Sequence, residues 1–320
     1  MNEVELVDDP NSVVYHVDGE LVPAASATVH VEDRGFAYGD AAFETMRAYG
    51  GEVFRWDAHA ERLADTCDAL ALDHGLSDAA LRERIDETLA ANEFEDAAVR
   101  CSITRGSQRG VLDPLPTVDP TVIVTVKPLP RGGIDAETVH DGPATMQTTK
   151  TRKPARRALP ADAKTHNYLN SVLARLELRV TNADEALMLD PDGTVAGGAA
   201  ATLFFVDGTA LKTPSLDGAV YPGVTRQTVI ELAEREGFPV EEGTYTPDDV
   251  READEVFLTN SRWQIRPVTT VDGIEIGRDG DEEENNRAND HGTGPLTTLL
   301  ARLYDHDVEE THYDGERIDG

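Results

Sequence analysis

The sequence predicts a mixed α/β protein built from two domains, and three observations support this fold class. Strand-like and helix-like runs alternate along the 320 residues, a stretch rich in Pro, Gly and charge at 128–138 separates two such series, and 39% of the residues are hydrophobic. That apolar content is sufficient for a sizeable core. We therefore expect a small N-terminal α/β domain over residues 1–127, a connection over 128–138 and a larger domain over 139–320.

The first domain is expected to begin with a hairpin and to place two helices before its later strands. Asp18-Gly19 is a pair typical of a two-residue hairpin turn, which needs positive φ. Asp57 is a candidate N-cap for a helix with apolar residues at helical spacing, and a second such helix begins at Ser77. The expected strands cover residues 13–17, 20–22, 98–104 and 121–126.

The larger domain is expected to combine strands and helices in the same way. Residues 280–294 contain almost no apolar side chain, which indicates a solvated, disordered insertion, with a functional acidic tether as the alternative. Strands are expected near 143–149, 186–190, 202–206 and 255–259, and helices near 166–181, 224–236 and 295–304.

The charge of the chain is strongly negative. There are 61 acidic against 29 basic residues, a formal net charge of −32. Such a charge repels phosphate backbones and anionic lipids, so neither nucleic acid nor a membrane surface is an expected partner. An acidic surface with only five lysines resembles the proteins of salt-in halophiles, and an acidic mesophilic protein is the alternative. The lysines are Lys127, Lys150, Lys153, Lys164 and Lys212.

The two cysteines, Cys67 and Cys101, lie in apolar patterns and are expected to be core thiols, because two residues make neither a disulfide framework nor a metal motif. The N-terminus has no leader pattern, and no apolar run approaches the roughly 20 residues of a membrane span. We expect a cytoplasmic protein. Walker, GxGxxG, HExxH, GxSxG and CxxC motifs are absent.

Lys164 precedes a helical run whose apolar positions are Leu169, Leu173, Leu176 and Val180. A lysine at a sheltered helix start, near other cations, can lose its proton and attack an aldehyde. The alternative is a lysine that snorkels at a helix end, and position alone favours this second interpretation.

Several separated motifs favour the interpretation of Lys164 as a nucleophile. In chain order they are DRGFAYGDAAFETMR at 33–47, FRWDAHAERL at 54–63, AKTHNYLNSVL at 163–173, YPGVTR at 221–226 and TNS at 259–261. Together they resemble the class IV aminotransferases, the fold-type IV pyridoxal-phosphate enzymes that include branched-chain aminotransferase, D-amino-acid transaminase and 4-amino-4-deoxychorismate lyase. The resemblance extends over about residues 13–275. It implies a barrel-like larger domain and a homodimer in which a partner loop completes each site.

The resemblance also implies roles for individual residues. Lys164 matches the lysine that forms the Schiff base with pyridoxal 5'-phosphate. Tyr38 matches a residue that faces the substrate, although a place in the core is about equally compatible with its position. A helix N-terminus at Val224 suits an anion. The implied cofactor ligands besides Lys164 are Arg62, Tyr168, the amide of Val224, the amide and hydroxyl of Thr225, and the hydroxyl of Ser261.

Two features favour the lyase branch of the family. Only two residues separate Lys164 from Asn167, and ITRGSQRG at 103–110 is similar to the lyase loop that presents arginine to an anionic substrate. Arg105, with Arg109, is therefore expected to bind substrate carboxylates, and Arg100 on the preceding strand is interpreted as structural. We expect cleavage of 4-amino-4-deoxychorismate to 4-aminobenzoate and pyruvate. The alternative is an aminotransferase acting on branched-chain or D-amino acids with 2-oxoglutarate.

One family residue is missing from the sequence. The glutamate that pairs with the pyridine nitrogen should fall at Gly197, where no acid is available. Without it the cofactor stores the carbanion's electrons less well, which disfavours transamination more than elimination. A degenerate relative with weak or no activity is a third hypothesis. A basic cluster at 150–157 is interpreted as a loop that balances nearby acids, with substrate attraction as the alternative.

Overall fold

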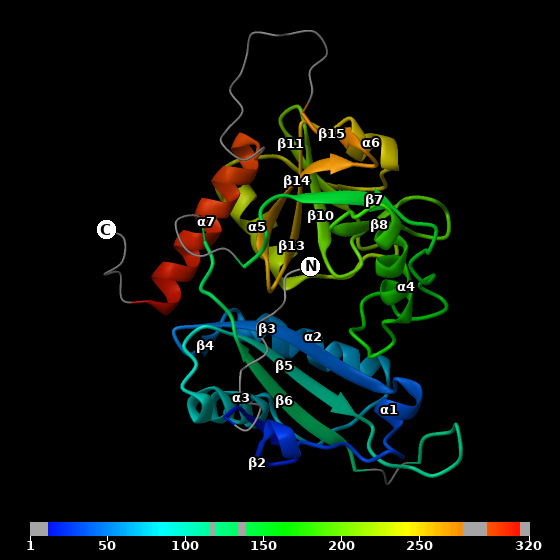
Figure 1. Ribbon diagram of the computed structural model, residues 1–320, viewed down its shortest axis with the longest axis vertical. Coiled ribbons are helices and arrows are strands. Elements are labelled where there is room, and N and C mark those ends of the chain that lie inside the picture. The colour runs from blue at the N-terminus through cyan, green and yellow to red at the C-terminus, as the bar shows by residue number, and fades with distance from the viewer. Residues whose placement is uncertain (1–11, 116–118, 134–138, 278–292, 314–320) are drawn as a thin grey trace. The chain divides into compact units, whose positions relative to one another are not determined.

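The computed structural model describes residues 12–115, 119–133, 139–277 and 293–313 (Figure 1). The chain divides into two compact units. The first consists of Met1–Arg131, Ala163–Asn167 and Glu310–Gly320, and the second of Gly132–Asp162 and Tyr168–Glu309. The division at 131/132 lies within the expected connection at 128–138, and a short segment around Lys164 joins the first unit. Residues 134–138 of that connection and 280–292 of the expected insertion lie outside the described residues.

The first unit is built on a six-stranded antiparallel sheet with the order β2-β1-β6-β5-β3-β4. The predicted hairpin is confirmed: Val17 pairs with Glu20, and Asp18 and Gly19 have φ of 49° and 96°. The strands are β1 (Val14–Val17), β2 (Glu20–Pro23), β3 (Ala41–Tyr49), β4 (Glu52–Val53), β5 (Ala97–Thr104) and β6 (Thr121–Pro128).

The helices of the first unit follow from local signals in the chain. The predicted helix start at Ser77 is confirmed: Ser77 is the N-cap of α3, and its hydroxyl accepts from the amide of Ala80. The expected cap of α2 is wrong by two residues: Arg55, in the left-handed region at φ 53°, is the N-cap, and Asp57 lies in the first turn. There its charge still favours the helix N-terminus. The helices are η1 (Ala24–Ser26), α1 (Arg34–Tyr38), α2 (Trp56–Ala69) and α3 (Asp78–Asn92).

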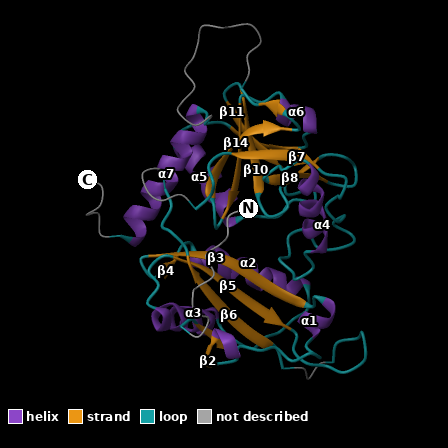
Figure 2. Cartoon of the chain, viewed as in Figure 1, coloured by secondary structure: helices purple, strands orange, loops and turns teal. Residues whose placement is uncertain are grey.

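Helices α2 and α3 lie against one face of this sheet (Figure 2). Leu63 and Cys67 of α2 and Ile85 of α3 pack with Val99 and Cys101 of β5 in one buried cluster. Both cysteines are free and buried, which confirms them as core thiols. Because side chains alternate along a strand, the neighbours of Val99 and Cys101 on β5 face away from this core.

The second unit contains a nine-stranded mixed sheet with the order β12-β11-β10-β13-β14-β7-β8-β9, with β15 paired to β14. The sheet is curled into a half-barrel, so the expected fold class is confirmed. Phe204 of β10 and Phe257 of β13 stack with ring centroids 5.1 Å apart. The strands are β7 (Ala144–Thr148), β8 (Glu185–Leu189), β9 (Val195–Gly197), β10 (Thr202–Asp207), β11 (Ala210–Pro214), β12 (Val240–Gly243), β13 (Glu255–Asn260), β14 (Gln264–Val271) and β15 (Ile274–Glu275).

The helix that follows the Lys164 segment turns its apolar positions outward. Leu169 is 66% exposed and Val180 is 88% exposed, whereas Ala174 and Leu178 face the protein. No helix in the described part of the chain is long and apolar enough to cross a membrane. The helices of the second unit are α4 (Leu169–Glu177), η2 (Leu178–Val180), α5 (Val224–Arg235), α6 (Pro247–Arg251) and the longer α7 (Pro295–His312), whose residues from Glu310 on are counted with the first unit.

Candidate functional site

Lys164 lies in an extended segment that is hydrogen-bonded to the start of β3. Its carbonyl accepts from the amide of Phe43 at 2.8 Å, and the amide of His166 donates to the carbonyl of Ala41 at 3.1 Å. The amide of Lys164 donates to Oγ1 of Thr66 on α2 at 3.1 Å. The expected helix start is therefore wrong, since α4 begins only at residue 169. Backbone pairing to a buried strand holds this lysine more firmly than a helix end would.

The side chain of Lys164 is half-buried and lies over an aromatic ring. Its Nζ is 4.7 Å from the ring centroid of Phe43, a cation–π contact. The nearby imidazole of His59 is fully buried, and its pKa lies below the usual value, first because of burial and also because Arg62 and Lys164 add positive charge. Lys164 thus has a fixed backbone and a cationic neighbourhood.

Arg62 belongs to a closed charge cluster behind β3. Its Nε donates to Oε1 of Glu44 at 2.8 Å and its Nη2 donates to Oε2 at 2.6 Å, which is bidentate pairing. Nδ1 of His59 lies 2.9 Å from the same Oε2. Although burial opposes ionisation, Arg62 and His59 lower the pKa of Glu44 to about 2. Glu44 therefore fixes the orientation of the arginine that the sequence assigns to a phosphate.

In the second unit, the N-terminus of α5 provides donors of the kind that an anion needs. Gly223 is the N-cap and has no side chain, so the first amides of the helix have no side-chain cap. A Cβ at Gly223 would come within 3.1 Å of Oγ1 of Thr202. Val224 and Thr225, the expected ligands, are the first two helical residues and are both buried.

A buried hydroxyl next to this helix lacks a partner. Oγ1 of Thr259 has no hydrogen bond within the described part of the chain, and Thr259 pairs with Thr202 across β13 and β10. A buried polar atom without a partner is costly unless a ligand or water satisfies it. Ser261 lies two residues further, in the turn before β14. Amides, hydroxyls and a glycine cradle together fit the phosphate of pyridoxal phosphate.

The two expected tyrosines lie in different settings. Tyr38 ends α1 and is 47% exposed, so its placement in the core is wrong, and Cζ of Arg34 lies 5.2 Å from its ring. Tyr168 is half-buried and is the N-cap residue of α4. The role of each toward substrate or cofactor stays a prediction.

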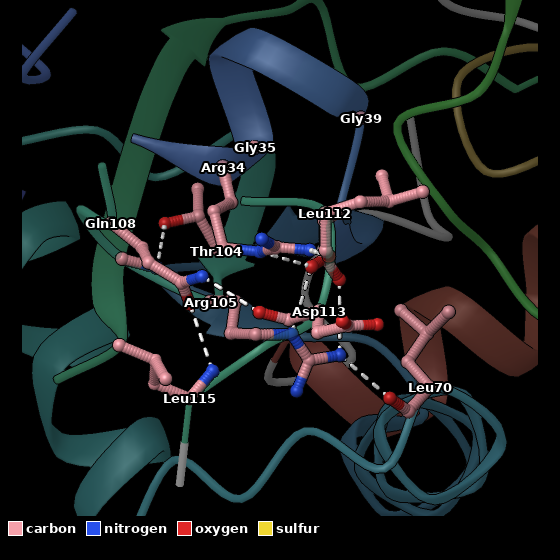
Figure 3. Close-up of polar contacts among 12 residues, drawn as sticks. Arg34, Gly35, Gly39, Leu70, Thr104, Arg105, Gln108, Leu112, Asp113 and Leu115 are labelled. Atoms are coloured by element: carbon pink, nitrogen blue, oxygen red, sulfur yellow. Dashed lines mark hydrogen bonds and ion pairs between the residues drawn. The ribbon is translucent and has the colours of Figure 1, made fainter. Parts of the chain in front are cut away.

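Arg105 is committed to the protein and does not suit the expected substrate role. Nε and Nη2 donate to the carboxylate of Asp40 at 2.8 and 3.0 Å, and Nη1 and Nη2 donate to the carbonyls of Ala71 and Leu70 at 2.8 and 2.6 Å (Figure 3). Four of its five N–H groups are thus used inside the fold. Arg109 differs, because its side chain is 87% exposed and pairs only at the surface with Glu32.

Arg100, which the sequence interpretation took as structural, lies close to Lys164 in the structure. Its Cζ lies 3.7 Å from the ring centroid of Phe43, the same ring that Lys164 contacts. Its Nε donates to Oγ of Ser102 at 3.1 Å. The signal was present in the strand pattern, because apolar Val99 and Cys101 flank Arg100 and place it on the opposite face of the sheet.

Gly197 adopts a backbone conformation that favours glycine. Its φ is 105°, and a Cβ there would lie 3.1 Å from the carbonyl oxygen of Ala201. The amide of Gly198 donates to that carbonyl at 2.8 Å and closes the turn. The absence of an acid at position 197 is therefore built into the backbone as well as the sequence.

The basic cluster at 150–157 is tied to its surroundings. The amides of Lys150 and Thr151 donate to the carboxylate of Glu177, and Arg156 donates to the carboxylate of Asp162 at 3.1 Å. These contacts support its interpretation as a loop that balances neighbouring acids.

Comparison with known proteins identifies relatives over most of the chain. Residues 41–271 match the family model for amino-transferase class IV. A putative branched-chain-amino-acid aminotransferase of Methanocaldococcus jannaschii is 36% identical over 258 residues, covering 81% of this chain and 88% of the relative. A D-alanine aminotransferase of Listeria monocytogenes is 30% identical over 297 residues, covering 92% and 94%.

Solved structures agree with these matches. A branched-chain aminotransferase of Thermoproteus uzoniensis, determined with norvaline, superposes with a TM-score of 0.82 at 28% identity and covers 94% of this chain and 97% of that chain. The branched-chain aminotransferase of Escherichia coli gives 0.84 at 26% identity, with coverage of 95% and 97%. These relatives are aminotransferases, so the preference for the lyase is not supported and the alternative fits better.

Proposed function

Because the chain belongs to the class IV aminotransferase family, whose members use pyridoxal 5'-phosphate, we propose that it transfers the amino group of a branched-chain amino acid to 2-oxoglutarate. The observation that carries the proposal is the position of Lys164, fixed by β3 with its Nζ over Phe43 and beside the cationic Arg100. The relative from Methanocaldococcus jannaschii supports a branched-chain donor, and the D-alanine relatives make the D-amino acids the competing choice.

The residues of this chain divide the tasks of binding the cofactor. Within the second unit, we assign the phosphate to the amides of Val224 and Thr225 and to the hydroxyls of Thr225 and Ser261. We assign to Lys164 the covalent bond to the cofactor's aldehyde carbon. The buried, partnerless hydroxyl of Thr259 supports the phosphate assignment, because a bound oxyanion would satisfy it.

The chemistry needs both a proton carrier and a carboxylate ligand. Pyridoxal phosphate, when bound, supplies the aldehyde that accepts amino groups and a ring that withdraws electrons from the substrate's α-carbon. Lys164 takes the proton from that carbon and later returns it at the accepting carbon. Arg100 binds the second carboxylate of 2-oxoglutarate, since a guanidinium matches a carboxylate in shape and charge.

A second copy of the chain is the partner that we propose. Five exposed residues of α4 and η2 are apolar, namely Leu169, Val172, Leu173, Leu176 and Val180. The other exposed residues there, Arg175 and Arg179, are basic in a chain of charge −32, and residues 169–180 hold one glutamate. Two copies repel each other less across this surface than elsewhere, and apolar faces of this kind are interaction sites. Light scattering tests the assembly: the wild type should be a dimer, and Leu173→Glu should shift it toward the monomer.

The function is tested on the protein purified in molar KCl with pyridoxal phosphate. We expect a visible absorption band that borohydride abolishes, and glutamate formation from 2-oxoglutarate with L-leucine. Lys164→Ala should lose both, whereas Lys150→Ala, a change at an exposed lysine, should keep both. Activity with D-alanine but not with L-leucine would show that the amino donor is a D-amino acid and not a branched-chain amino acid. Release of pyruvate from 4-amino-4-deoxychorismate without an oxo acid would restore the lyase, and no band in the wild type would leave a degenerate relative.

A further inference from the structure

Four side chains share the face of the first sheet that α2 and α3 do not cover. The antiparallel register places Phe43 opposite Ser102 and Thr45 opposite Arg100 on β3 and β5. Directly opposed residues point to the same face, so Arg100, Ser102 and Phe43 are neighbours. The Lys164 segment, paired to the start of β3, adds His166 to this group: its ring meets that of Phe43 edge-on at 5.6 Å between centroids.

The polar atoms of this group form a chain from Arg100 through Ser102 to His166. Arginine can only donate, so Nε of Arg100 donates to Oγ of Ser102 at 3.1 Å. A serine hydroxyl has one proton, and the nearest ring nitrogen, Nε2 of His166, lies 3.3 Å from Oγ. When His166 is neutral with its proton on Nδ1, Ser102 donates to Nε2, and both lone pairs of Oγ face donors such as Arg100.

The surroundings keep this imidazole neutral. Burial, and then the charge of Arg100, lower the pKa of His166 to about 4, while the charge of Asp33 opposes the shift. A neutral imidazole with its proton on Nδ1 accepts the Ser102 hydrogen bond at Nε2, so the hydroxyl proton points away from Arg100 and the lone pairs of Oγ point toward it near neutral pH. The guanidinium is thus held at one place over Phe43, next to Lys164.

We propose that Ser102 and His166 are positioning residues that hold the Arg100 guanidinium over Phe43, where it selects dicarboxylic over monocarboxylic acceptors. This inference rests on the proposed function for the identity of the acceptor. It adds two residues that do not touch the substrate: Ser102 is 6% exposed, and His166 acts through it. A guanidinium that is free to swing loses part of its advantage, because each binding event must first order it.

The first test measures binding and needs no turnover. Glutarate and butyrate, which cannot react, are titrated into the holoenzyme by calorimetry. Ser102→Ala and His166→Leu should weaken glutarate binding about tenfold, the effect of one lost hydrogen bond to a charged group, and change butyrate binding less than twofold. His166→Gln keeps an acceptor for the Ser102 hydroxyl and should restore glutarate binding.

A matched control lies on the other side of Arg100. Thr125 of β6 is directly opposite Arg100, and Thr125→Val should leave both affinities unchanged. Equal losses for glutarate and butyrate, or no loss in either variant, would overturn the proposal.

A second readout separates this proposal from the function on which it rests. In the active enzyme, Ser102→Ala should raise the KM for 2-oxoglutarate about tenfold at unchanged kcat, and leave the KM for 4-methyl-2-oxopentanoate alone. A wild type without amino transfer contradicts the proposed function, whereas the glutarate measurement still decides the role of Ser102 and His166. Nitrogen NMR should also show the Nδ1–H tautomer of His166 in the wild type and its loss in Ser102→Ala.

Discussion

The two faces of the first sheet hold their arginines in different ways. On the face covered by α2, Arg62 is buried and is clamped by both oxygens of Glu44. On the opposite face, Arg100 is half-buried over Phe43 and is held at Nε by a neutral hydroxyl. Strand alternation alone separates these environments, since Glu44 and Cys101 face inward and their neighbours outward. A bidentate ion pair thus orients Arg62, whereas a hydrogen bond from Nε to a neutral hydroxyl orients Arg100.

The largest effect on the difference between the two faces is expected from removing the carboxylate of Glu44. Glu44→Gln leaves Arg62 and His59 buried without their anion, so we expect a loss of about 3 kcal/mol in the free energy of unfolding. Urea denaturation at high salt measures it. Thr45→Val, one residue further on the opposite face, is the control and should change stability by less than about 1 kcal/mol. Equal losses of stability in Glu44→Gln and Thr45→Val would show that the ion pairs of Glu44 do not account for the effect.

Acid should affect the two clusters in separate pH windows. The pKa of Glu44 is lowered from 4.5 to about 2, so its contribution, about 3 kcal/mol, is complete above pH 4.5 and is lost as the pH falls toward 2. The pKa of His166 is lowered from 6.5 to about 4, so the stability of its neutral form is complete above pH 6.5 and is lost between 6.5 and 4.

Unfolding titrations between pH 7 and 3 test these windows. His166→Gln should lose less stability than the wild type between pH 6.5 and 4, and Glu44→Gln should differ least from the wild type at the acid end. A His166→Gln curve parallel to the wild type through the upper window would contradict the assignment.

Arg105 offers a direct comparison with Arg100, because it immediately follows β5, the strand that carries Arg100. Arg105→Gln should cost about 2 kcal/mol of stability through its lost bonds to Asp40, Leu70 and Ala71, with KM values within about twofold of the wild type. Denaturation and steady-state kinetics measure the two effects. A large rise in the KM for 2-oxoglutarate would return the substrate role to Arg105.

The smallest effect is expected at Arg109. Its exposed pair with Glu32 is worth less than about 0.5 kcal/mol, so Arg109→Gln should be close to the wild type in stability and in KM. The same two assays apply. A clear loss in either one would show that this surface residue meets a ligand.

Local chemistry made much of the fold predictable. Asp18-Gly19 and Ser77 act through their own backbone neighbourhoods, so a short window of sequence contains the full signal. Lys164 was found because the chain has few lysines and because its motif resembles a family. Its pairing with β3 was not foreseen, since Phe43 lies more than a hundred residues away and no local pattern records that contact.

The site was less predictable because partners decide what an arginine does. Arg105 lies in a loop that resembles a substrate loop, yet Asp40 and two carbonyls occupy it. Arg100 was interpreted as structural, yet it shares a ring with Lys164. The apolar side of α4 is likewise a pattern whose partner the sequence does not specify.

The backbone conformation of Gly197 also limits which side chains this position can accept. A glutamate at that position would carry a Cβ at φ 105° and 3.1 Å from the carbonyl oxygen of Ala201, so it would be strained and the turn at 197–201 would have to shift by a few tenths of an ångström. An engineer who wishes to restore the missing carboxylate should therefore redesign the turn at 197–201 together with the residue, so that the new side chain meets a backbone that suits it.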